Sequence, residues 1–139
     1  MPERPSIYDQ EHEDFRATAR AFMEKEVVPH IEEWESAGQV SREVWLKAGE
    51  TGLLGFDVEE EYGGAGIKDF RYNMVLAEEA ARAGASGPGF AVHTDIIVPY
   101  ISSLGTPSQK ARWLPGLVSG ELISAIAMTE PGAGSDLQG

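Results

Sequence analysis

The stretch "GELISAIAMTEPGAGSD" (Gly120–Asp136) is the point at which the local pattern of this sequence changes. Its first half, residues 121–130, is mainly apolar without helical spacing, and Gly120 and Pro131 bound it. Such a run between turn residues is typical of a buried strand. Because a single strand is unstable without partners, we expect the rest of its sheet to lie outside these 139 residues.

Helical spacing dominates the sequence before that stretch. Apolar residues recur at intervals of three and four, and capping or breaking residues bound the segments. The predicted helical ranges are 9–38 with a bend at Pro29, 41–52 capped by Ser41, 69–84 capped by Asp69, 90–104, and a last helix capped by Thr106. In the range 69–84, an apolar stripe is formed by Phe70, Met74, Ala77 and Ala81. A strand is the alternative for 90–104, which contains Pro99 and many β-branched residues.

Length and composition fit one ordinary globular domain. The chain has 139 residues, of which 42% are hydrophobic and 24% charged, close to the values of folded domains. Together with the helical ranges, this predicts an all-α bundle of about five or six helices over residues 1–120. Over residues 121–139 we expect one C-terminal strand of an otherwise missing β domain.

Charge and residue usage exclude several function classes. The formal net charge of −12 disfavours nucleic acid and anionic lipid as partners, because both require a basic surface. The sequence contains no cysteine, so disulfides, thiolate catalysis and cysteine metal sites are excluded; the histidines lack metal-ligand spacing, so no metal site is predicted. No stretch resembles a signal peptide or reaches the roughly 20 apolar residues of a membrane span. We therefore expect a cytoplasmic protein.

The second half of the opening stretch carries the most chemically suggestive residues. Gly132 and Gly134 flank Ala133 in a predicted turn, and the backbone N–H groups of this turn are not used in the hydrogen bonds of a β-sheet. Thr129 and Ser135 add hydroxyls, which suit a polar ring edge or a pyrophosphate. Neither a P-loop ending nor GxGxxG spacing is present. From these residues alone, a plain turn explains the composition equally well.

Four segments in sequence resemble the acyl-CoA dehydrogenase family of flavoproteins. "AMTEPGAGSD" (127–136) resembles the family's signature segment, and "GLLGFDVEEEYGGAG" (52–66) its glycine-rich loop. "LAEEAARAGAS" (76–86) resembles the helix after that loop, and "LGTPSQKARWLPGLVSGEL" (104–122) the run before the signature. The segments keep the family's order and spacing from about Ile7 onward. One departure is Glu59, where the family commonly has proline.

The resemblance implies an FAD-dependent enzyme that desaturates acyl-CoA thioesters between the α and β carbons. Residues 1–120 would be its N-terminal helical domain, and residues 121–139 the start of its middle β domain with the flavin-binding loop. The catalytic base of the family is a glutamate beyond residue 139, so no catalytic residue is assigned here. We expect the chain to be a fragment without turnover of its own. The implied partners are an acyl-CoA substrate, electron-transfer flavoprotein or a similar acceptor, and further copies of the enzyme in a homo-oligomer.

The resemblance also assigns site residues. The flavin contacts would come from Ile126, Ala127, Met128, Thr129, Gly134 and Ser135. Of these, Ser135 would also bind the pantetheine-phosphate arm of CoA, and the stretch 90–100 would help to line the acyl pocket. His93 has two possible roles, which are a residue of the substrate pocket or a hydrogen-bonded histidine of the core.

Two other functions stay open. A non-catalytic helical module could bind a partner or self-associate through apolar faces that the missing domains would cover. Alternatively, the chain could hold FAD through the loop alone, with few of the family's contacts and little affinity.

Overall fold

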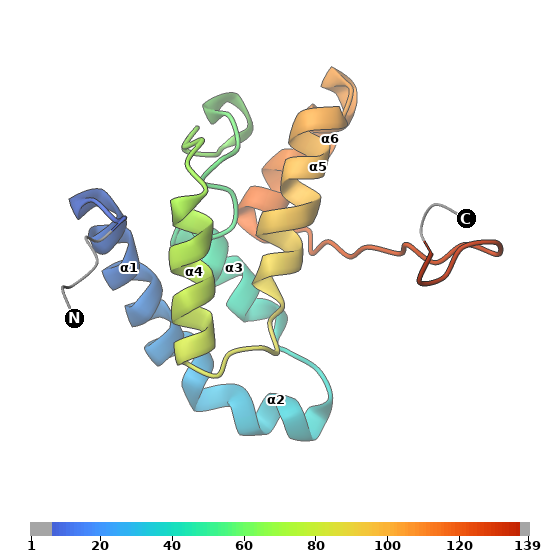
Figure 1. Cartoon of the computed structure of the whole chain (residues 1–139). Helices are drawn as coiled ribbons and strands as arrows, with labels where there is room; N and C mark the ends of the chain where they lie inside the picture. Colours follow the sequence, from blue (N-terminus) through green and yellow to red (C-terminus); the bar gives the residue numbers. More distant parts are fainter. Residues whose placement is uncertain (1–6, 137–139) are drawn as a thin grey trace, which may run out of the picture.

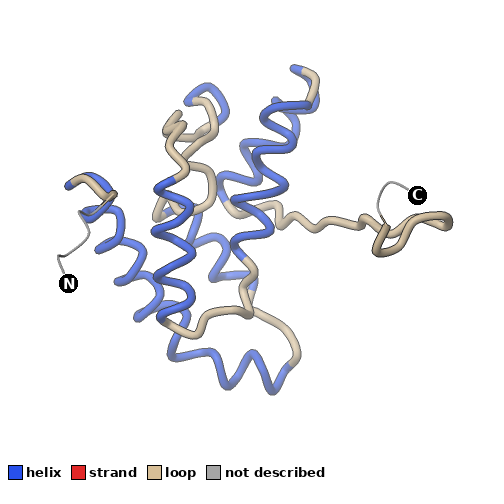
Figure 2. The backbone as a smooth tube through the Cα atoms, in the orientation of Figure 1, coloured by secondary structure: helices blue, strands red, loops and turns tan. Residues whose placement is uncertain are grey.

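A computed structural model, which describes residues 7–136, shows a helical chain (Figure 1). The elements in order are α1 (Gln10–Phe22), η1 (Met23–Val27), η2 (Val28–His30), α2 (Ile31–Ala37), α3 (Arg42–Glu50), η3 (Glu60–Tyr62), α4 (Arg71–Arg82), η4 (Val92–Ile97), α5 (Val98–Leu104) and α6 (Pro107–Ser119). Figure 2 shows no strand in the described residues. The predicted helical bundle is confirmed, and the strand alternative for 90–104 is wrong.

The predicted N-terminal caps of two helices are confirmed. The Ser41 hydroxyl accepts a hydrogen bond from the Glu43 N–H at 3.2 Å at the start of α3. At α6, Thr106 and Gln109 form a reciprocal capping box, with Thr106 N–H to Gln109 Oε1 at 2.8 Å. Such caps stabilise a helix because they satisfy N–H groups that lack an intrahelical acceptor.

Prolines explain the two wide helical turns. The π-helical elements η1 and η4 both end two residues before a proline, Pro29 or Pro99. Proline donates no hydrogen bond, and its ring crowds the carbonyl four residues earlier. A locally wider turn accommodates that loss without ending the helix. The bend predicted at Pro29 is therefore present as a change of helical geometry.

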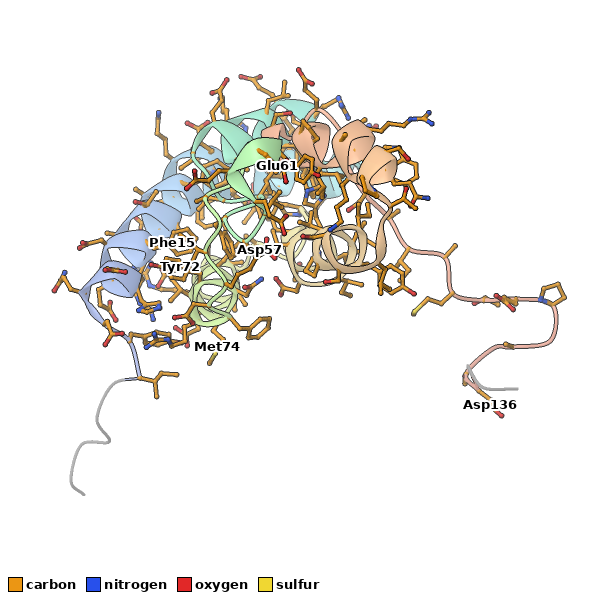
Figure 3. The ribbon with its side chains drawn as sticks, turned by 90° about the horizontal axis from the view of Figure 1, so that it is seen from above. Phe15, Asp57, Glu61, Tyr72, Met74 and Asp136 are labelled. Atoms are coloured by element: carbon orange, nitrogen blue, oxygen red, sulfur yellow. The ribbon has the colours of Figure 1, made fainter. Side chains whose placement is uncertain are left out.

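The core lies between α1, α3, α4 and the loop before α4. Phe15 of α1 and Tyr72 of α4 pack edge to face, with ring centroids 5.1 Å apart (Figure 3). The glycine-rich loop contributes Leu53, Leu54 and Phe56, all buried. A smaller cluster joins the loop to α5 and α6. The predicted glycine-rich loop is thus an interior segment of the fold.

The face that α4 buries differs from the predicted stripe. Phe70 is 65% exposed and Met74 is 36% exposed. In Figure 3, Met74 lies on the outer side of α4, away from the other helices. The buried side carries Tyr72, Val75 and Leu76. Apolar residues occupy both sides of this helix, so spacing alone could not choose between them. Packing against α1 decides the face.

Residues 121–129 leave the helices as an extended segment (Figure 1). Glu130 and Ala133 then pair across a turn, with N–H to carbonyl distances of 3.0 and 3.1 Å. Within residues 7–136 no second strand lies beside this segment, so the strand stays a prediction. The described helices include none that is long and apolar enough to cross a membrane.

Candidate functional site

The candidate site is carried by the segment that follows α6, and the base of this segment is tightly fixed. Gly120 ends α6 with φ 78°, and a Cβ atom there would overlap the backbone of Trp45. Only glycine fits such an approach. The Leu122 N–H donates to the Gly116 carbonyl at 2.9 Å, and the Arg42 guanidinium donates to the Glu121 carbonyl. Helices α3 and α6 therefore hold the start of the segment.

His93 of η4 adds a further anchor. Its side chain is 0% exposed, and Nε2 lies 3.0 Å from the Leu117 carbonyl oxygen. A carbonyl can only accept, so Nε2 carries the proton and Nδ1 is the acceptor. Nδ1 lies 2.9 Å from Ser124 Oγ and 3.4 Å from Ser124 N. Burial lowers the pKa of His93, partly opposed by the bond to Leu117.

The structure thus places His93 in the core with both ring nitrogens hydrogen-bonded, and contact with substrate stays a prediction. Ser124 has a role that sequence reasoning missed. Its only signal in the sequence is a hydroxyl residue inside an apolar run. Nothing in the sequence pairs it with His93, because the two residues are 31 positions apart.

The six residues assigned to flavin lie together on the exposed part of the segment and its turn. They are Ile126, Ala127, Met128, Thr129, Gly134 and Ser135. Within residues 7–136, no hydrogen bond uses the N–H groups of Met128 and Thr129 or the hydroxyls of Thr129 and Ser135. Several donors on one short segment are therefore available to a ligand or to a neighbouring domain.

The glycines of the turn are not required by the described fold. A Cβ atom at Gly132 or Gly134 would meet nothing within 4 Å, and neither residue has a positive φ. A glycine that its own backbone does not need is typical of a place where another group approaches the chain closely. This observation favours a ligand at the turn over a plain turn.

An exposed apolar face runs along η4 and α5. Val92, Ile96 and Tyr100 recur every four residues along η4 and α5, and all three are exposed. Val92 directly precedes His93, whereas Phe90 and Val98 of the same stretch are buried in the core. The stretch 90–100 is therefore divided between core and surface.

A groove of about 380 Å³ lies between α4 and η4. Its walls are mainly small and apolar, including Ala77, Ala81 and Ala91. At one side, Asp95 Oδ1 accepts hydrogen bonds from Asn73 Nδ2 and Thr94 Oγ1, both at 2.7 Å. The groove can therefore bury an apolar group beside a small polar network.

The charged residue Glu59 of the glycine-rich loop serves the fold. Glu59 stands where the family commonly has proline. It accepts a hydrogen bond from Ser102 Oγ at 3.2 Å and forms an ion pair with Lys68 at 3.4 Å. It ties the glycine-rich loop to α5. No group of three or more potential metal ligands occurs among residues 7–136.

Comparison with known proteins gives concordant matches. The model of the family "Acyl-CoA dehydrogenase, N-terminal domain" matches residues 9–121. The mouse long-chain specific acyl-CoA dehydrogenase, mitochondrial, is 52% identical over 133 residues, which cover 96% of this chain and 31% of that protein. The chain thus spans about a third of the length of the curated relatives it matches.

Two solved structures show the same architecture. An acyl-CoA dehydrogenase from Geobacillus kaustophilus superposes with a TM-score of 0.87 at 52% identity, covering 94% of this chain and 34% of that one. An acyl-CoA dehydrogenase from Bacillus anthracis, solved in complex with FAD, gives a TM-score of 0.76 at 37% identity, covering 97% of this chain and 23% of that one.

Proposed function

Because this chain belongs to the acyl-CoA dehydrogenase family, a family of oxidoreductases, we propose that it supplies the helical domain and one side of the flavin site of an enzyme that desaturates acyl-CoA thioesters. The observation that carries the proposal is the set of unused donors on the segment 126–135, together with glycines that the fold itself does not need.

The residues present fit a flavin. Bound FAD would supply the hydride acceptor. The Met128 N–H and the Thr129 hydroxyl would donate hydrogen bonds to its ring, and such donors stabilise the negative charge that reduction creates there. The Gly134 and Ser135 N–H groups would face phosphate, with the Ser135 hydroxyl reaching FAD or the CoA arm. The relative from Bacillus anthracis, described as complexed with FAD, supports this assignment.

We assign the acyl chain to the exposed face of Val92, Ile96 and Tyr100. An acyl chain that covers these side chains removes apolar surface from water, which favours binding by about 25 cal/mol for each Å² buried. The name of the mouse relative, a long-chain specific enzyme, supports long acyl groups as the substrate class. Electron-transfer flavoprotein as the acceptor and assembly into a homo-oligomer belong to the same proposal.

Removal of the α-proton requires a desolvated carboxylate and hydrogen bonds to the developing enolate oxygen. None of the described carboxylates is assigned this role, and the family resemblance puts the base beyond residue 139. The 139 residues by themselves should therefore bind and orient without turning substrate over.

A chimera tests the proposal. The 139 residues would replace the corresponding part of the Geobacillus kaustophilus protein, which the similarity of sequence and backbone makes practical. We expect the purified chimera to hold FAD and to reduce a dye with acyl-CoA substrates, fastest with long chains. A folded chimera that holds no flavin would refute the assignment of the segment. Steady turnover by the 139 residues alone would refute the proposal that they bind and orient substrate without catalysis.

A second candidate function is self-association through the start of α4. Phe70 and Met74 form an exposed apolar pair on this helix, and exposed apolar side chains that lie together favour association. Light scattering of the chain over a range of concentrations tests this function. A monomer at all concentrations would contradict it.

A further inference from the structure

Four parts of the molecule meet at the His93 ring. The residue belongs to η4, its Nε2 atom donates to the Leu117 carbonyl of α6, and its Nδ1 atom accepts from Ser124 of the segment. The Trp45 ring of α3 lies 5.1 Å away, measured between centroids. Because the Leu117 carbonyl requires a proton on Nε2, it keeps Nδ1 free to accept.

Ser124 is the last contact point before the flavin residues. From Ala125 to Thr129, no described residue hydrogen-bonds to the helical body. Extended backbone advances about 3.3 Å per residue, so the position of Ser124 limits where Ile126 to Thr129 can lie. Without it, the preceding anchor is Leu122 on the Gly116 carbonyl. With Ser124 held, the free part of the segment is shorter, so the segment can leave the helices in fewer directions.

We propose that His93 is a positioning residue for the flavin-binding segment, because its Nδ1 atom holds Ser124 and so fixes where the segment leaves the helices. The inference rests on the proposed function of residues 126–135. His93 touches neither flavin nor substrate in this role and acts through Ser124 alone.

The anchor depends on a neutral ring. A protonated imidazole donates from both nitrogens, and Nδ1 can then no longer accept from Ser124. The groups that pack against the ring are the Trp45 indole of α3, the Leu117 carbonyl of α6 and Ser124, and none of these is charged. The nearby Asp95 of η4 hydrogen-bonds to Asn73 and Thr94 instead.

Two substitutions separate the two hydrogen bonds of the ring. In His93→Gln, the side-chain amide nitrogen can still donate to Leu117, but the Nδ1 acceptor is lost. In His93→Asn, the amide oxygen takes the place of Nδ1 and can accept from Ser124. Ser124→Ala removes the hydroxyl contact at 2.9 Å without disturbing the ring, and leaves only the longer contact from the residue 124 N–H at 3.4 Å. Ser103→Ala, on the exposed side of α5, is the matched control for loss of a hydroxyl.

The readout is the mobility of the segment, measured without flavin. Because the chain has no cysteine, Ala125→Cys offers a unique site for a nitroxide label directly after Ser124. We expect the rotational mobility of the label to rise about twofold or more in His93→Gln and Ser124→Ala, with no further rise when both are combined. Mobility in His93→Asn and Ser103→Ala should equal that of the parent. Unchanged mobility in Ser124→Ala would overturn the proposal, even if the His93 variants fail to fold.

Flavin affinity, measured in the chimera, separates this inference from the proposed function. We expect Ser124→Ala and His93→Gln to weaken FAD binding about tenfold and His93→Asn to preserve it. Increased mobility with unchanged FAD affinity would overturn the positioning role. A chimera that binds no flavin before any substitution would instead refute the proposed function and leave the measured mobility to decide the anchor.

Discussion

Glu79 of α4 accepts two hydrogen bonds from the guanidinium of Arg20 on α1, both at 2.8 Å. The Glu79 side chain is nearly inaccessible to water, and Arg16 adds a contact at 3.3 Å. A buried carboxylate costs free energy unless it is paired in this way. The pair therefore joins α4 to α1 and favours the side of α4 that carries Glu79 as the one that faces α1.

Replacing Glu79 by glutamine should lower the free energy of unfolding by about 2 kcal/mol, because the neutral amide has one acceptor oxygen and cannot keep both charge-assisted bonds from Arg20 in a buried place. The neighbouring Glu78→Gln is a matched control, since Glu78 is exposed and its pairs with Arg16 and Tyr8 lie at the surface. Its cost should stay below about 1 kcal/mol. Chemical denaturation measures both, and equal losses would contradict a special role for the buried pair.

Acid should act on the same pair. Hydrogen bonds from Arg20 lower the pKa of the Glu79 carboxyl in the folded state. The unfolded chain then binds more protons, so stability is fully present above the usual glutamate pKa of about 4.3 and is lost as pH falls below it. The acid-induced loss of stability should be smaller in Glu79→Gln than in the parent. Identical pH profiles would contradict this linkage.

His93 predicts a separate pH effect closer to neutrality. Burial lowers its pKa in the folded state, so the unfolded chain binds the proton more readily. Stability should therefore fall as pH decreases from about 6.5, the usual histidine value, toward the lower folded pKa. His93→Asn, which does not titrate, should lack this part of the profile. A parent whose stability is constant between pH 6.5 and 5 would refute a buried neutral ring.

The glycine-rich loop gives a steric prediction. A Cβ atom at Gly64 would overlap the backbone of Val58 and Gly55, and backbone cannot move aside as a flexible side chain can. Gly64→Ala should cost about 3 kcal/mol of stability. Gly132→Ala is the control, because nothing lies within 4 Å of the added atom. A tolerated Gly64→Ala would mean that the loop is not packed as described.

Local rules accounted for much of this fold. Ser41 and Thr106 could be recognised as caps because the acceptor and its N–H partner lie within three residues. The choice of face on α4 could not be predicted, since it depends on Glu79 and an arginine 59 residues away. Apolar residues such as Phe70 then lie outward although their spacing fits a buried stripe.

The candidate site was predicted less completely. Glycine, serine and threonine content alone left the turn at Gly132–Ser135 without an assigned role, and the family resemblance was needed to propose flavin. The contact between His93 and Ser124 depends on the packing of η4 against α6 and the segment, which no local pattern encodes.

Gly134→Ala tests whether flavin lies against this segment, and it does so without altering the fold. The described fold leaves open space for the added methyl group, so helicity and stability of the chain should not change beyond about 0.5 kcal/mol. If flavin approaches this backbone closely, the same methyl group obstructs it.

The most direct measurement is therefore the dissociation constant of FAD for the chimera with and without Gly134→Ala, beside the thermal stability of the two apoproteins. We predict equal stability and binding weakened about tenfold or more, since a misplaced methyl group costs at least about 1.4 kcal/mol at a close contact. Equal dissociation constants in two equally stable proteins would contradict the placement of flavin against this segment.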